Sequence, residues 1–66
     1  MGGVRLSKRE TEIMGLVAKG LTAGEIAEKL FLSTNTVENH KRNIVRKLDA
    51  RNTVDAVAKA IRMKLI

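Results

Sequence analysis

The side chains best suited to binding chemistry in this chain of 66 residues gather between Ser33 and Leu48. Val37, Ile44 and Leu48 recur there at helical spacing. They predict a helix over residues 34–48 with one narrow apolar stripe. The rest of its surface carries hydroxyls and amides in the first turn and becomes basic toward the end. Such a helix suits the major groove of duplex DNA, although a solvated surface helix shows the same pattern.

The charge distribution favours DNA binding over a solvated surface helix. The chain has a formal net charge of +6. Residues 34–66 hold eight basic and three acidic residues, whereas residues 1–33 hold five basic and four acidic residues. The positive excess therefore lies in the half that contains the polar helix, as expected for a face that binds a polyanion. Binding to an anionic membrane is disfavoured, because tryptophan is absent and no helix sets bulky apolar anchors opposite its charges.

Size and composition exclude other classes of protein. A domain this small buries only about 60% of the surface of its unfolded chain, so tight helix packing or a partner must stabilise it. Cysteine is absent and no carboxylate is spaced to join the single histidine, so we expect no metal site and no cofactor. Without a glycine-rich phosphate loop or paired carboxylates beside a base, the chain does not resemble an enzyme. Lacking an apolar span or a signal peptide, it is expected to be cytoplasmic and associated with the nucleoid.

Signals for helix termini divide the chain into helices. Residues 7–10 and 22–25 have the Ser/Thr-x-x-Glu pattern of a capping box, and Ser33 is a third N-cap candidate. Gly20 is placed to end the first helix. A last helix is predicted from Thr53 to about Met63, with Asn52 or Thr53 as its N-cap.

The middle of this pattern is a short helix, a tight turn and the longer polar helix. Leu32 in the turn is predicted to enter the core and Phe31 to be half exposed. This is the helix-turn-helix arrangement, whose second helix enters the major groove. The expected fold is therefore all-α: a flexible start over residues 1–5, followed over residues 6–66 by a compact four-helix domain with a central helix-turn-helix.

The last helix carries two apolar stripes. The first consists of Ala56, Val57 and Ala60. The second consists of Val54, Ala58, Ile61 and Leu65. Both stripes can be buried if the helix lies deep in a groove, or the second can be a dimer contact. We expect a mixture, in which the first stripe faces the core and part of the second is shared with a partner copy.

Several stretches occur in an order that resembles a known family. They are Leu6-Ser7-Lys8-Arg9-Glu10-Thr11-Glu12-Ile13-Met14, Ala18-Lys19-Gly20-Leu21-Thr22, Glu25-Ile26-Ala27, Leu32-Ser33-x-x-Thr36-Val37-x-x-His40, Lys47-Leu48 and Ala56-Val57. Over residues 6–66 the chain is similar to the LuxR-type (GerE-like) helix-turn-helix domains of bacterial transcription regulators. The resemblance implies binding to double-stranded DNA as a homodimer. It also implies a receiver or sensing domain ahead of this domain in a longer parent chain, and RNA polymerase as a further partner.

The resemblance also implies roles for individual side chains. Base-reading is implied for Glu38, Asn39 and Arg42. Arg42 fits because a guanidinium can donate two parallel hydrogen bonds to guanine, and Asn39 can read adenine. Contacts with the DNA backbone are expected from Ser33, Thr34, Thr36, His40, Lys41, Arg46, Lys47 and Arg51. Within that set, the positions of Ser33, Thr36, His40 and Lys47 either lie near the backbone or brace the helix.

Two positions depart from the family pattern. Many relatives carry Lys or Arg at the position of Glu38, where a carboxylate would be repelled by phosphates. Glu38 can accept from a cytosine amino group, pair with Arg42 one turn later, or face water. Thr53 stands where arginine is common, so one backbone or bracing contact is expected to be lost. His40 is expected at the edge of the core, with one ring nitrogen free to meet a phosphate.

The function expected from these features is sequence-specific binding of double-stranded DNA by the effector domain of a transcription regulator. One alternative is a promoter-binding module like region four of a sigma factor, which has a related helix-turn-helix. Another is a helical module that binds proteins. Single-stranded RNA is disfavoured as a ligand, because no set of aromatic residues is present for stacking bases.

Overall fold

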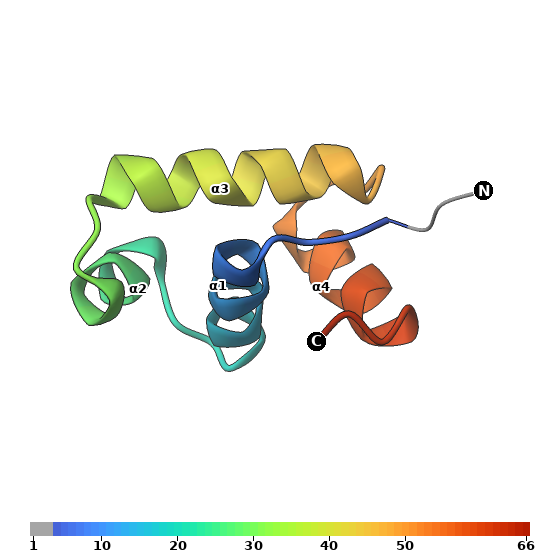
Figure 1. Ribbon diagram of the computed structural model, residues 1–66, viewed down its shortest axis with the longest axis horizontal. Helices are drawn as coiled ribbons and strands as arrows, with labels where there is room; N and C mark the ends of the chain where they lie inside the picture. Colours follow the sequence, from blue (N-terminus) through green and yellow to red (C-terminus); the bar gives the residue numbers. More distant parts are fainter. Residues whose placement is uncertain (1–3) are drawn as a thin grey trace.

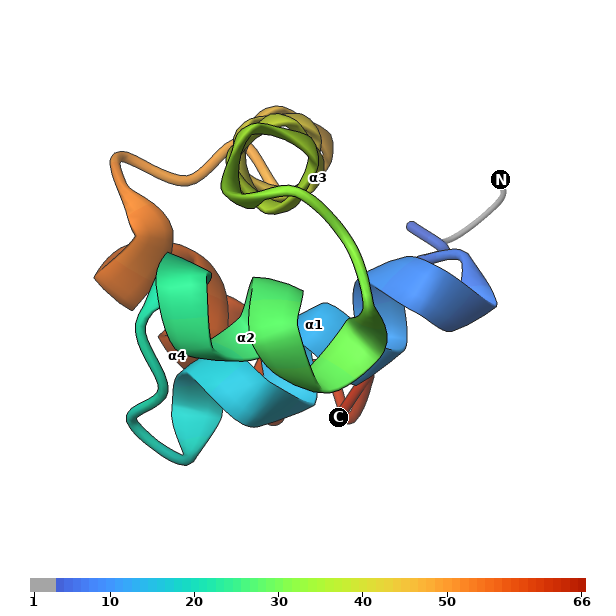
Figure 2. The same cartoon turned by 90° about the vertical axis from the view of Figure 1, so that its left-hand side faces the viewer.

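Four helices make up the described part of the chain, residues 4–66, in the computed structural model. They are α1 (Lys8–Ala18), α2 (Ala23–Leu30), α3 (Thr34–Lys47) and α4 (Thr53–Arg62). The predicted all-α, four-helix architecture is confirmed. The longest helix, α3, lies across a layer formed by the other three (Figure 1). Seen along its axis, α3 rests above that layer with its far side uncovered (Figure 2).

The predicted flexible start lies partly outside the described residues, since the structure describes nothing before Val4. Val4 itself is half-buried and packs against the core. The chain therefore contacts the core two residues before Leu6, where the folded domain was predicted to begin.

Local sequence signals set the beginning of each helix. At α1, the Ser7 hydroxyl accepts from the Glu10 amide at 3.1 Å, and the Glu10 carboxylate accepts from the Ser7 amide at 2.8 Å. A capping box over residues 22–25 begins α2 in the same way. Ser33 caps α3 and Asn52 caps α4. Each cap satisfies backbone N–H groups that the first turn of a helix leaves without partners.

The turn between α2 and α3 depends on a left-handed residue. Phe31 has φ 58° and ψ 43° and its amide donates to Ala27 O. Its exposed fraction is 94%, so the prediction of a half-exposed side chain is wrong. The left-handed backbone reverses the chain and directs Leu32, not Phe31, toward the core, where Leu32 packs half-buried. With this turn, α2 and α3 form the predicted helix-turn-helix.

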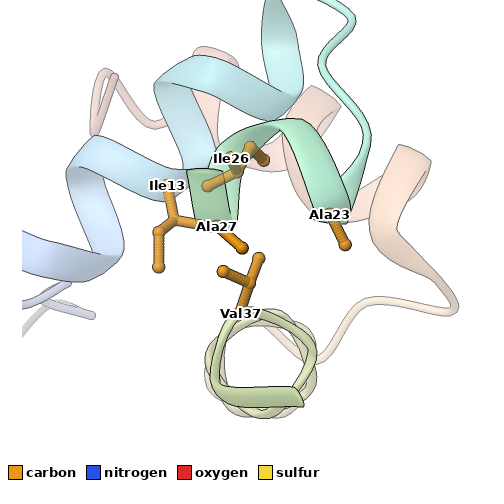
Figure 3. Close-up of a cluster of buried hydrophobic side chains, with 5 residues drawn as sticks. All are labelled: Ile13, Ala23, Ile26, Ala27 and Val37. Carbon is orange, nitrogen blue, oxygen red and sulfur yellow. The ribbon is translucent and has the colours of Figure 1, made fainter. Parts of the chain in front are cut away.

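Two buried clusters hold α3 in place. The first cluster consists of Ile13, Ala23, Ile26, Ala27 and Val37. Figure 3 shows Val37 pointing from α3 toward Ala27 and Ile26 of α2. The second cluster consists of Met14, Ile44, Leu48, Ala56 and Ala60. Since Val37 enters one cluster and Ile44 and Leu48 enter the other, the predicted apolar stripe of α3 is confirmed, as is the inward-facing stripe of α4.

Candidate nucleic-acid interface

The side of α3 turned away from both clusters is polar and exposed. Four exposed side chains follow one another along it at intervals of four, three and four residues: Asn35, Asn39, Arg42 and Arg46. This spacing places them on one side of the helix, opposite the buried stripe. We call these four residues the outer face. The sequence prediction had named three of them and omitted Asn35, although the same helical spacing identifies it.

Hydrogen bonds and ion pairs arrange the side chains of this region. Arg42 Nη1 donates to Asn39 Oδ1 at 3.2 Å. Lys41 Nζ lies 3.6 Å from Glu38 Oε1 and forms an ion pair one turn along the helix. Of the alternatives left open for Glu38, the pair with Arg42 is not the one formed. The Glu38 carboxylate therefore offsets part of the charge of Lys41. Arg42 forms its hydrogen bond with Asn39 and not with Glu38.

A shallow surface depression of about 210 Å³ lies beside the outer face. Its lining residues come from α3 and from the start of α4: Glu38, Lys41, Arg42, Val45, Asn52 and Thr53. Two cations and one carboxylate thus share its wall. Arg51, which was predicted to contact the DNA backbone, is exposed and directly precedes the lining residue Asn52 in the sequence. Positive charge is therefore present beside the outer face as well as on it.

The first turn of α3 carries hydroxyl groups that serve the helix itself. Ser33 Oγ accepts from the Thr36 amide at 3.0 Å and donates to Thr36 Oγ1 at 2.8 Å. Thr34 is exposed beside this cap. His40 is half-buried, as expected for a residue at the edge of the core. Ser33 and Thr36 therefore fix the beginning of α3, and their hydroxyls lie at its solvent-exposed end.

The C-terminal end of α3 is tied to the beginning of α1. Lys47 Nζ donates to Glu10 Oε1 at 2.7 Å, and this carboxylate also accepts from Ser7. Burial raises the pKa of Glu10, but hydrogen bonds from Lys47 and Ser7, together with the charge of Lys47, hold that pKa below its ordinary value. Of the two roles predicted for Lys47, the structure shows bracing. Sequence patterns missed this pair because its members are 37 positions apart.

A second lysine braces the same end from α4. Lys59 Nζ donates to Asp49 O at 2.7 Å and to Leu48 O at 3.4 Å. These carbonyls lie just after α3, where helix geometry supplies no amide partner. Lys59 also pairs with Asp55 at 3.8 Å. The amide of Arg51 donates to Asp55 and lowers the pKa of its carboxyl group, and the charge of Lys59 acts in the same direction.

The pKa of Glu10 leads to a prediction about acid stability. Because this pKa is lower in the folded than in the unfolded chain, the stabilisation is fully present above the ordinary value of 4.5 and is lost as pH falls through the folded-state pKa. We expect Glu10→Gln to lower the free energy of unfolding at neutral pH by only about 1 kcal/mol, since the Lys47 side chain is 43% exposed and water screens its charge. This loss should vanish in acid. Thermal melts of wild type and of Glu10→Gln from pH 7 to pH 2 measure the stability of each protein as a function of pH.

Glu12→Gln is the matched control for that experiment. Glu12 is an acidic residue on the same helix, and within residues 4–66 its ion pair is with Arg9 at 3.7 Å, where both side chains are about half exposed. Its replacement should change the free energy of unfolding little at any pH. Parallel curves for wild type and Glu10→Gln would contradict the role assigned to the Glu10 carboxylate.

The outer side of α4 exposes apolar groups. The exposed fractions of Val54 and Ile61 are 79% and 55%, and Ala58 between them is also exposed. Leu65, which was predicted to belong with them, is half-buried and packs against the second cluster. Val54, Ala58 and Ile61 therefore form an exposed apolar strip, whereas Leu65 belongs to the core.

Across residues 4–66, no three His, Asp or Glu side chains come together in a way that could hold a metal ion. None of the helices in this part of the chain has the length and apolar character needed to cross a membrane.

Comparison with known proteins identifies the fold. Residues 4–60 match the family described as bacterial regulatory proteins, luxR family. The oxygen regulatory protein NreC of Staphylococcus haemolyticus is 51% identical over 61 residues, which cover 92% of this chain and 28% of NreC. The structure of the transcription factor GerE superposes with a TM-score of 0.88 at 30% identity, covering 91% of this chain and 90% of GerE.

A second solved structure gives the same result. The response regulator ChrA, from a heme-sensing two-component system, superposes with a TM-score of 0.91 at 36% identity and covers all of this chain but 33% of ChrA. The chain thus spans less than a third of NreC and about a third of ChrA. From the sequence match and the shared structure together, the chain belongs to the luxR family of bacterial regulatory proteins.

Proposed function

We propose that this chain binds duplex DNA in a sequence-dependent manner as the effector domain of a bacterial transcription regulator. The observation that carries the proposal is the outer face of α3, where amide and guanidinium groups project from a helix held at both ends. Ser33 and Thr36 fix its beginning, and Lys47 and Lys59 hold its C-terminal end in place. A polar helix that presents fixed donors suits the major groove. The names of GerE and ChrA, a transcription factor and a response regulator, support the proposal.

In this proposal the two kinds of DNA contact come from different parts of α3. Glu38, Asn39 and Arg42 face base edges in the groove. The cations beside them meet phosphates, together with the hydroxyls and the histidine near the beginning of the helix. These backbone contacts are assigned to Ser33, Thr34, Thr36, His40, Lys41, Arg46 and Arg51. Lys47 acts through Glu10 and positions the helix.

We further propose that two copies bind through the outer side of α4. Val54, Ala58 and Ile61 form a narrow apolar strip, and alanine at its centre lets two helices approach closely. A two-fold contact of this kind matches half-sites separated by about 34 Å, one turn of DNA. The name of ChrA, a response regulator of which this chain covers 33%, supports a receiver or sensing domain in a longer parent protein. The proposal includes a cytoplasmic location and RNA polymerase as the eventual partner.

The dimer proposal predicts the effect of a charge on this strip. Ile61→Lys should leave the melting temperature nearly unchanged, because the side chain is exposed. It should weaken binding to DNA with two half-sites by about tenfold or more, through loss of the linked second binding event. Binding to one isolated half-site should stay the same, which provides the internal control. Equal affinities of wild type and variant for the two-half-site duplex would contradict the assignment.

The central experiment is a fluorescence-anisotropy titration against random duplex DNA at several salt concentrations. We expect log K to fall linearly with log[salt], with a slope of about −0.9 for each phosphate neutralised. Arg46→Ala should make the slope about one unit shallower. Lys19→Ala removes the same charge just after α1, whose end lies on the side opposite α3, and should leave the slope unchanged (Figure 1). Absence of salt-sensitive duplex binding would refute the proposed function.

A further inference from the structure

We propose that Asn35 is the amide that reads adenine, and that Asn39 is a positioning residue that holds Arg42 for its contact with guanine. This inference rests on the proposed function, because both roles require α3 in the major groove. It replaces the base contact assigned to Asn39 above by a positioning role, and it adds a specificity-determining residue at the first turn of the helix.

The role of Asn39 follows from the bond that it makes. An asparagine reads adenine by accepting from the N6 amino group through Oδ1 while donating to N7 through Nδ2. In this structure Oδ1 of Asn39 already accepts from Arg42 Nη1 at 3.2 Å. An adenine amino group would have to share that oxygen with a cationic donor. The contact instead restrains the guanidinium, whose fork can then meet the two acceptors of guanine.

Asn35 lies one turn earlier on the same face and has a different environment. Its side chain is exposed, and the hydrogen bonds found within residues 4–66 do not engage its amide. The cap of α3 uses Ser33 and Thr36, so the carboxamide of Asn35 is not needed there. Both its oxygen and its nitrogen therefore remain available for a bidentate contact. Recognition helices of helix-turn-helix proteins contact base edges with their N-terminal residues, where Asn35 lies.

The spacing along α3 gives this proposal a geometric consequence. Asn35 and Arg42 are seven residues apart, which is about 10 Å along the helix axis. Base pairs stack about 3.4 Å apart, so this distance spans at most about three base-pair steps, and fewer where α3 runs obliquely along the groove. Each half-site should therefore contain an adenine within about three base pairs of the guanine that Arg42 contacts.

The experiment selects preferred duplexes from a random library with wild type, Asn35→Ala and Asn39→Ala. Asn43→Ala, which removes another exposed amide two turns later on α3, is the matched control. Asn35→Ala should lose the preference for adenine, about 5- to 150-fold in wild type, and should keep the preference for guanine. Asn39→Ala should keep the preference for adenine and weaken the preference for guanine. Asn43→Ala should keep both.

A base analogue then tests the atom involved. Replacing the selected adenine by purine removes its N6 amino group, which should weaken binding by wild type and by Asn39→Ala but not by Asn35→Ala. All three variants should melt like wild type, since alanine is a good helix former at exposed positions. Loss of the adenine preference in Asn39→Ala with retention in Asn35→Ala would overturn the proposal, and so would a half-site without adenine at that spacing. Failure of wild type to bind any duplex would instead refute the proposed function itself.

Discussion

Ile44→Ala is expected to remove a large share of the free energy of unfolding. Ile44 is fully buried where α3 meets α1 and α4 in the second cluster. Truncation of a buried isoleucine costs about 2–5 kcal/mol through lost transfer free energy and the cavity left behind. A chain of this length has a total stability of only about 3–10 kcal/mol. The chain has no cysteine, so no disulfide can offset this loss of stability.

Urea unfolding followed by circular dichroism measures this effect. Val54→Ala is the matched control, because it also shortens a β-branched side chain but at a position with an exposed fraction of 79%. It should change the free energy of unfolding by less than about 0.5 kcal/mol. A midpoint for Ile44→Ala close to that of wild type would show that the second cluster does not hold α3 in place.

Arg42→Ala is expected to weaken binding to the selected DNA site by about 5- to 150-fold and to relax the preference for guanine at one position. The physical reason is the loss of a forked, charged donor that meets two acceptors on one base. Arg42→Lys should not restore the preference, because an ammonium lacks the planar fork. Since Arg42 is exposed, both variants should melt like wild type.

Competition between specific and random duplexes separates base reading from simple charge. Arg62→Ala removes one positive charge at the end of α4 and should change binding to both duplexes little. Lys41→Ala should weaken both duplexes by a similar factor, as expected for a phosphate contact. If Arg42→Ala also weakened both equally, Arg42 would be a phosphate contact, and the proposed guanine contact would be wrong.

The fold was predictable because its signals are local. The Ser7–Glu10 box, the Ser33 cap and the alternation of buried and exposed residues along α3 each depend on neighbours within a few turns. Hydrophobic spacing likewise identified Val37 and Ile44 as core residues. Such patterns report which side of a helix is buried, and this is enough to choose an all-α fold with a helix-turn-helix.

The site was less predictable because its geometry depends on distant or competing partners. Nothing near Lys47 in the sequence indicates that it bonds to Glu10 on another helix. Arg42 bonds to Asn39, and Lys41 pairs with Glu38. These partners depend on the directions of the side chains, which cannot be read from the residue types. The sequence thus identified the polar helix correctly, while the structure showed which of its side chains are already engaged.

The division of the interior into two clusters has a consequence for how this sequence can diverge. Ile13 and Met14 are neighbours on α1, yet they enter different clusters. Substitutions in α2 and substitutions in α4 therefore touch separate sets of neighbours, and their effects on stability should add rather than compound. The outer side of α4 can therefore change in sequence while the helix-turn-helix keeps its packing. Only α1 and α3, which contribute to both clusters, must satisfy both at once.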